Sequence, residues 1–348
     1  MVLKHAIVDR IDQAYQTIAA AEPPFRNHLG GSMIGKNCER ELMYSFRWSV
    51  RPSFDGRMLR LFERGHKEEF RFVNFLRMIG MNVREYAERL LYDPHFEGGE
   101  PYRKVSWDHP LTGGIDGREI DVTGDVFHME RAKKAIPPIE LKQWRISDVE
   151  GHFGGSLDGI ADAPFDIPVD VGTSIEALLQ SSSLKFIPAG TEFLLEFKTH
   201  NTKSFCKLVA EGVKAAKPIH WAQMQIYMHK KGLGFAVYVA VNKNDDDLWI
   251  EVVEYDPAEG PKLLERAARV IHARTLPPRV GKHPSWHECK FCDYAKQCHY
   301  SAPLEKNCRT CKHATPVEDG QWRCGHWNAI IPSANILEGC DSYSVITD

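Results

Sequence analysis

The sequence lacks a long apolar run and any strong excess of charge of one sign. No stretch approaches the roughly 18 to 20 apolar residues of a membrane span, and the charged start, MVLKHAIVDRIDQAYQ, does not contain a signal-peptide core. The formal net charge of −3 produces no general attraction for polyanions. These absences predict a cytoplasmic protein without a membrane partner, in which any nucleic-acid binding comes from local patches or bound cations.

Internal repeats and low-complexity tracts are also absent. The chain of 348 residues is 43% hydrophobic and 26% charged, which is enough for a sizeable core in one large domain or two modest ones. Nine cysteines are present, and seven of them lie in the last 60 residues. In an intracellular chain such clustering favours metal ligation over disulfides. We expect Cys206, which has no partner nearby in the sequence, to be a buried structural thiol.

The order of hydrophobic patterns predicts an α/β fold. Residues 1–90 have helical periodicity, including a long amphipathic stretch that ends on Gly80. Short β-rich runs broken by glycine follow between about 100 and 200, and residues 165–190 resemble an insertion between two strands. A helix over 217–232, two strands and a helix over 258–275 complete the pattern, and 275–284 resemble a linker.

A charged pair on an apolar strand is the first candidate for chemistry. Glu196 and Lys198 lie two apart in EFLLEFKTH, so both side chains project from the same face of a strand. There a carboxylate can hold Mg²⁺ or Mn²⁺ and an ammonium can orient a water for phosphodiester hydrolysis. The simpler interpretation is a salt bridge at a strand edge.

Two acidic residues that precede this pair in the sequence are candidates for a further metal ligand. Asp158 lies among glycines in GGSLDGIAD, where substrate can approach the backbone closely, although it suits a turn equally well. Asp116 in GGIDG is a competing acid. We favour Asp158 because it is nearer in sequence to the Glu196 strand.

Two helices supply the remaining candidates. Gln223 and Tyr227 lie one turn apart and can face one cleft, or can simply pack in the core. His66 is a possible ligand on an earlier helix, where a lone histidine is more often structural. Glu69 follows on the same face, and we expect it to be a solvated surface charge rather than a further ligand.

In this order the residues resemble the PD-(D/E)xK superfamily, specifically its RecB-like exonucleases, over roughly residues 30 to 300. The resemblance implies a restriction-endonuclease-like core, a mixed central sheet flanked by helices, with a helical N-terminal region and a small metal-binding C-terminal tail. It implies that His66, Asp158, Glu196 and the Phe197 carbonyl bind Mg²⁺ or Mn²⁺ and that Lys198 orients water. Gln223 and Tyr227 resemble the family's Q-x-x-x-Y helix. Leu157 replaces the proline of the motif, and the 38-residue step from Asp158 to Glu196 requires an insertion.

The cysteines form two arrays. The first is C-x2-C-x5-C at Cys289, Cys292 and Cys298, whose spacing is compatible with iron-sulfur or zinc. The resemblance implies that Cys38 is the fourth ligand of a 4Fe-4S cluster that clamps the chain ends together.

The second array lies in the tail, which is short enough to need a metal for stability. Its spacing resembles a structural zinc site, in which His313 or His326 can replace a cysteine, and the simpler alternative is free thiols. Its members are Cys308, Cys311, Cys324 and Cys340.

These patterns divide the chain into four predicted parts. Residues 1–95 are a helical region that carries Cys38 and the His66 motif, 96–280 the nuclease core, 281–302 the iron-sulfur segment and 303–348 the zinc-binding-like tail. The resemblance implies a Mg²⁺- or Mn²⁺-dependent exonuclease on single-stranded DNA or DNA ends, and a helicase or recombination partner that the sequence does not identify. The alternatives are a catalytically inactive DNA-binding or assembly protein and a zinc-ribbon regulator.

Overall fold

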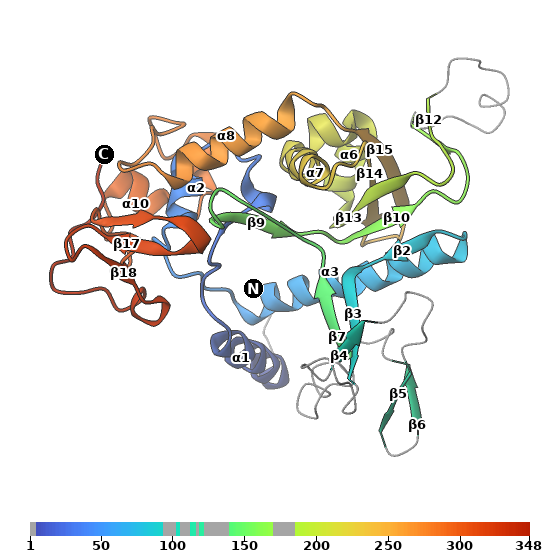
Figure 1. Cartoon of the computed structure of the whole chain (residues 1–348), viewed down its shortest axis with the longest axis horizontal. Coiled ribbons are helices and arrows are strands. Elements are labelled where there is room, and N and C mark those ends of the chain that lie inside the picture. Colours follow the sequence, from blue (N-terminus) through green and yellow to red (C-terminus); the bar gives the residue numbers. More distant parts are fainter. Residues whose placement is uncertain (1–4, 93–101, 105–111, 116–117, 122–138, 170–184) are drawn as a thin grey trace.

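A five-stranded mixed sheet lies at the centre of the fold in the computed structural model, which describes residues 5–92, 102–104, 112–115, 118–121, 139–169 and 185–348 (Figure 1). The central pair of strands, β13 and β14, is parallel, and the other pairs are antiparallel. The strand order is β15 (Leu248–Glu254), β14 (Phe235–Asn242), β13 (Glu192–His200), β10 (Gly159–Asp162) and β2 (Asn82–Arg84).

Helices cover both faces of this sheet. On one face, Phe72 and Val73 of α3 pack with Phe197 and Val239. On the other face, helices α6 and α7 pack against residues such as Leu194, and α8 packs on α7. Both faces are therefore buried, which explains the continuous apolar runs of the two central strands. The predicted α/β class with a mixed, helix-flanked sheet is confirmed.

Three of the long helices have recognisable capping residues. Asp55 and Asn201 accept backbone N–H groups at the starts of α3 and α6, and Gly232 ends α7 in the left-handed conformation at φ 68°. Within the described residues, no helix is both long and apolar enough to cross a bilayer. The helices are α1 (Ala6–Ala21), α2 (Glu39–Phe46), α3 (Gly56–Met78), α6 (Thr202–Ala216), α7 (Pro218–Lys231), α8 (Glu259–Ile271), α9 (His287–Lys290) and α10 (Ala295–Tyr300), with 3-10 turns η1 (Gly31–Met33), η2 (Glu318–Gly320) and η3 (Ser333–Asn335).

Smaller sheets surround the centre, in the orders β1-β9-β8, β4-β3-β7, β5-β6, β11-β12 and β16-β17-β18. Strand β2 and most of β3 fall within residues 1–90, so the helical prediction for that segment extends about ten residues too far. The β11-β12 hairpin confirms that the segment over 165–190 is inserted between neighbouring strands β10 and β13. The strands are β1 (Leu29–Gly30), β3 (Tyr86–Tyr92), β4 (Tyr102–Lys104), β5 (Thr112–Ile115), β6 (Arg118–Asp121), β7 (Ile139–Gln143), β8 (Arg145–Asp148), β9 (Phe153–Ser156), β11 (Ile167–Pro168), β12 (Phe186–Ile187), β16 (Ala314–Pro316), β17 (Trp322–Cys324) and β18 (Ala329–Ile331).

The C-terminal tail docks on the N-terminal region through a buried arginine. The Arg309 guanidinium lies 3.7 Å from the ring centroid of Trp48 and 5.0 Å from that of Trp322. It donates to the carbonyl oxygens of Phe46 at 3.2 Å and Asn27 at 3.0 Å. Burial lowers the Arg309 pKa to about 9, so these rings and carbonyls compensate part of the cost of burying the cation.

We predict that Arg309→Ala lowers the free energy of unfolding by about 2–4 kcal/mol, because the substitution removes ring contacts and two charge-assisted hydrogen bonds. Denaturant titration followed by circular dichroism measures the change. The matched control is Arg323→Ala, because Arg323 is an exposed tail arginine that donates to Asn328. This control should stay within about 0.5 kcal/mol of wild type. Equal losses in the two variants would contradict the role of Arg309.

Candidate active site

The charged pair of β13 lies on the face of the sheet that α7 covers. Glu196 is completely buried, and its Oε2 accepts a hydrogen bond of 3.0 Å from Gln223 Nε2. The Lys198 ammonium forms an ion pair with Glu196 Oε1 and donates to the Phe197 carbonyl oxygen at 2.9 Å. Because β13 lies between β14 and β10, the interpretation as a salt bridge at a strand edge does not apply.

Asp158 brings a third oxygen to the same ammonium. It lies at the bend between β9 and β10, and Gly159 is opposite Leu195 in the antiparallel pairing with β13. Its Oδ2 accepts the Phe197 backbone N–H at 2.7 Å and lies 3.9 Å from Lys198 Nζ. The competing acid, Asp116, lies outside the described residues. The 38-residue step thus joins adjacent strands.

The candidate residues line two adjoining cavities. One, of about 650 Å³, is lined by His66, Asp158, Phe197, Gln223 and Tyr227. The other is lined by Lys198 and again by His66 and Phe197. The structure therefore brings the predicted residues of α3, the β9–β10 bend, β13 and α7 to one place. Glu196 is buried behind this wall.

Glu69 differs from the expectation of a solvated surface charge. It is half-buried and lines both cavities, one helical turn after His66. Burial, and then the negative charge of Asp158, raise the Glu69 pKa to about 8. The sequence does not predict this position, because spacing shows that Glu69 shares a helix face with His66 but not that this face meets the sheet.

The electrostatics of the site favour an additional cation. Burial alone lowers the pKa of Lys198, but the neighbouring charges of Glu196 and Asp158 outweigh it and raise the pKa, so the lysine stays protonated. Burial raises the Glu196 pKa to about 7. Three carboxyl groups, those of Glu69, Asp158 and Glu196, thus face one ammonium. A divalent cation bound beside these carboxyl groups would stabilise their ionised forms and lower their pKa values.

Tyr227 lies closely against two glycines. A Cβ atom on Gly31 would come within 2.7 Å of Tyr227 Cε1, and a Cβ on Gly155 would meet the Tyr227 hydroxyl. Burial raises the pKa of Tyr227, and its hydroxyl hydrogen-bonds with Gln223. Glycine at 31 and 155 therefore lets the tyrosine reach the floor of the cavity.

Two further sets of residues lie at the site although no sequence motif indicates them. Arg26 and Arg145 line the cavity of about 650 Å³ but belong to no motif. His200 Nε2 and His220 Nδ1 each lie 2.9 Å from the Tyr238 hydroxyl, beside Lys198 on the same face of the sheet. Burial lowers the His220 pKa to about 3, so this network stays neutral and joins β13, β14 and α7. Only the fold places these residues together.

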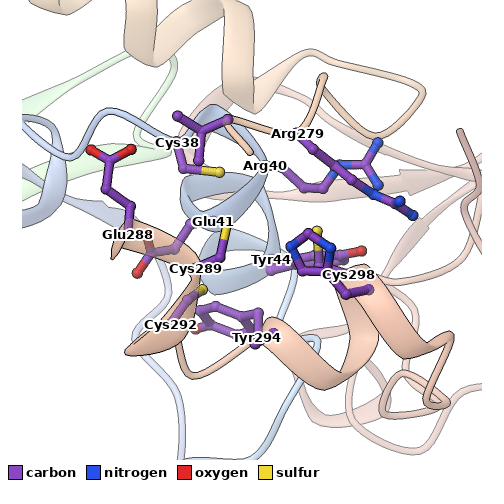
Figure 2. A pocket seen from close by; sticks show the side chains of 13 residues that line it. Cys38, Arg40, Glu41, Tyr44, Arg279, Glu288, Cys289, Cys292, Tyr294 and Cys298 are labelled. Atoms are coloured by element: carbon purple, nitrogen blue, oxygen red, sulfur yellow. The ribbon is translucent and has the colours of Figure 1, made fainter. Parts of the chain in front are cut away.

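Four cysteines from opposite ends of the chain line one cavity, as Figure 2 shows. Cys38 caps α2, Cys289 lies in α9, Cys292 follows it and Cys298 lies in α10. Burial raises the pKa of Cys289, Cys298 and, to about 12, Cys292. Such thiols ionise only if a strong positive charge is present, as in a metal cluster.

The tail cysteines also lie together. Burial raises the pKa of Cys308, and the neighbouring thiols of Cys340, Cys311 and Cys324 raise it further. The Ser344 backbone N–H points to Cys311 Sγ at 3.5 Å. The alternative ligands His313 and His326 have ring centroids 5.5 Å apart. Sulfur donors of this number and kind fit tetrahedral zinc.

As the side chains stand, no group of three or more His, Cys, Asp or Glu in the described part of the chain is close enough to hold a single metal ion. At the β13 site, the Lys198 ammonium lies between the oxygens. Cys206 is exposed on α6, so the expectation of a buried thiol is wrong.

Comparisons with known proteins give only distant resemblances. No protein-family model and no curated protein matches the sequence. Among solved structures, SSO0001 is 11% identical and covers 85% of this chain and 98% of its own, with a TM-score of 0.38. The alkaline exonuclease LHK-Exo from Laribacter hongkongensis is 14% identical, and the match covers 75% of this chain and 90% of that chain with a TM-score of 0.35. The structure of LHK-Exo in complex with dAMP is 13% identical, and the match covers 84% of this chain and 98% of that chain with a TM-score of 0.36. Resemblances this weak carry no argument about activity.

The raised pKa of Glu69 predicts a pH-dependent effect on stability. Because the folded state binds this proton up to about pH 8 and the unfolded state releases it near pH 4.5, stability falls as pH rises through that window. Glu69→Gln cannot ionise. Without divalent cations it should therefore melt at a higher temperature than wild type at about pH 8.5, and at a similar temperature at about pH 5.

Differential scanning fluorimetry at both pH values measures this effect. The control is Glu68→Gln, because Glu68 forms a surface ion pair with Arg71 on the same helix. This control should gain no stability at high pH. A Glu69→Gln variant that melts at or below the wild-type temperature at about pH 8.5 would show that the cavity holds the ionised carboxylate without cost.

Proposed function

We propose that the protein is a metal-dependent DNA nuclease that hydrolyses phosphodiester bonds, with the ends or single strands of DNA as substrate. One observation carries the proposal: Glu196, Asp158 and the Phe197 carbonyl converge on the Lys198 ammonium at the wall of a cavity. Carboxylate and carbonyl oxygens are the ligands that Mg²⁺ and Mn²⁺ prefer. A cation thus already lies among the oxygens proposed to bind metal.

Burial of these charges is costly and contributes little to stability. Replacing a buried ionic group with apolar side chains of similar volume is often neutral or stabilising. Glu196 is completely buried on a strand that is otherwise apolar. A functional requirement therefore explains the charged set better than a structural one, which disfavours the alternative of an inactive scaffold.

Each residue has a proposed role. Asp158, Glu196 and the Phe197 carbonyl would hold the cation, together with His66 of α3, which lines the same cavity. Gln223 keeps Glu196 oriented through its hydrogen bond. Lys198 orients the attacking water and, being protonated, stabilises negative charge on the phosphate. Bound there, Mg²⁺ or Mn²⁺ supplies neutralisation of the phosphate oxygens and activation of water.

The cysteines are proposed to hold two structural centres. Cys38, Cys289, Cys292 and Cys298 would ligate a 4Fe-4S cluster, and the tail set of Cys308, Cys311, Cys324 and Cys340 would ligate zinc. The chemistry of the donors and the convergence of distant cysteines on one cavity support the first centre. It would tie α2 to the segment after α8, and thereby hold the cavity wall formed by Tyr294.

We predict that wild-type protein degrades end-labelled single-stranded DNA with Mn²⁺ and not with EDTA, and that Lys198→Ala is at least about 10²-fold slower. Denaturing gels of timed samples measure the rate. The matched control is Lys207→Ala, because Lys207 is an exposed lysine paired with Glu211 on α6. It should retain wild-type activity. Absence of metal-dependent cleavage by wild type, or equal rates for both lysine variants, would defeat this proposal.

The cluster is tested by colour and metal content. Aerobically purified protein should be brown and contain near-stoichiometric iron, which Cys292→Ser loses while it keeps zinc, and Cys311→Ser should show the opposite loss. The exposed Cys206 provides the control, because Cys206→Ser should keep both metals. Colourless protein loaded with zinc alone would contradict the iron-sulfur assignment.

A further inference from the structure

A second cavity, of about 890 Å³, adjoins the candidate active site. The two cavities share part of their walls, so a chain bound in one can continue into the other. The shared residues are Arg26, His28, Gly30, His66, Glu69 and Phe197. Of these shared residues, the proposed nuclease mechanism uses only His66 and the Phe197 carbonyl.

Several aromatic side chains line the second cavity. Phe54 and Phe62 are 46% and 42% exposed, and their rings meet edge to face with centroids 5.1 Å apart. Phe25, on the same wall, stacks on Trp48 at 5.0 Å between centroids and 10° between planes. Exposed aromatic rings held in position by neighbours offer flat faces to a ligand.

One of the aromatic rings, that of Phe62, lies on the same helix as the proposed metal ligand His66. Phe62 and His66 lie four residues apart on α3, so they share a face and are separated by about 6 Å along the helix axis. A base stacked on Phe62 would therefore lie about 6 Å along α3 from His66, next to the proposed cation site. Lys198 lines this same cavity.

The charges on the wall suit a polyanion locally, although the net charge of the chain is −3. Arg26, Lys36 and Lys198 line the cavity against Asp293 and Glu69. Lys36 also pairs with Glu41. Three cationic side chains thus line this cavity against two carboxyl groups. Cations beside flat aromatic rings are the arrangement that binds an unpaired nucleic-acid strand.

We propose that this cavity binds an unpaired DNA strand, with Phe62 and Phe54 stacking on the bases next to the bond that is cleaved. The proposal rests on the proposed nuclease function and names the residues that select an unpaired strand. Bases in a duplex are already stacked and paired, so they cannot present their faces to Phe62. The rings therefore discriminate against duplex DNA without reading its sequence.

Binding of oligonucleotides in EDTA tests this proposal without cleavage. Fluorescence anisotropy with a labelled thymidine strand of about 12 nucleotides should show that Phe62→Ala weakens binding about tenfold, equivalent to about 1.4 kcal/mol. Phe62→Trp should keep the affinity because it retains a flat ring. Phe165→Ala, at a phenylalanine that is 48% exposed and lines neither cavity, should bind as wild type does.

A strand of abasic residues isolates the contribution of the bases. It should bind wild type and Phe62→Ala equally, and blunt duplex should bind wild type more weakly than the thymidine strand does. Equal binding of the thymidine strand by wild type and Phe62→Ala would overturn the proposal even if the protein cleaves DNA. If the Phe62 effect is present but wild type does not cleave DNA with Mn²⁺, the stacking site stands and the nuclease function fails.

Discussion

The position of the Lys198 ammonium among three oxygens is the interaction on which the rest of the site depends. It joins Glu196, the Phe197 carbonyl and Asp158, and so connects the central strand β13 to the bend before β10. An ammonium surrounded by oxygens in a buried region is stable only if each partner is held in place. Gln223 holds Glu196 from α7, and the Phe197 backbone N–H holds Asp158.

The second constraint is the joining of the chain ends. Arg309 of the tail is inserted against Trp48, and Arg40 of α2 forms an ion pair with Asp348 and donates to the Pro277 carbonyl. The cavity lined by four cysteines lies beside these contacts. Residues of the N-terminal region, such as Arg26 and His66, line both cavities. The attachment of this region to the C-terminal segments therefore helps to determine the shape of the two cavities.

Local regularities explain which features the sequence predicted well. The two-residue repeat of a strand puts Glu196 and Lys198 on one face, and the helical repeat aligns Gln223 with Tyr227. Pro218 at the first helical position and Gly232 after the last turn set the bounds of α7. Where no local repeat applies, the sequence predicts the structure poorly: β2 lies in a segment with helical periodicity, Cys206 is exposed and Glu69 lines a cavity.

The sequence by itself determined the α/β class, the shared faces of Glu196 with Lys198 and of Gln223 with Tyr227, and the residue types able to bind cations, because these depend on spacing and side-chain chemistry. Only the tertiary structure decided that α3 faces the bend at Asp158, that Arg26 and Arg145 line the same cavity, and that Phe54 and Phe62 form a wall beside it. The reason is physical: contacts between elements far apart in the chain are set by packing of the whole core, which no local repeat encodes.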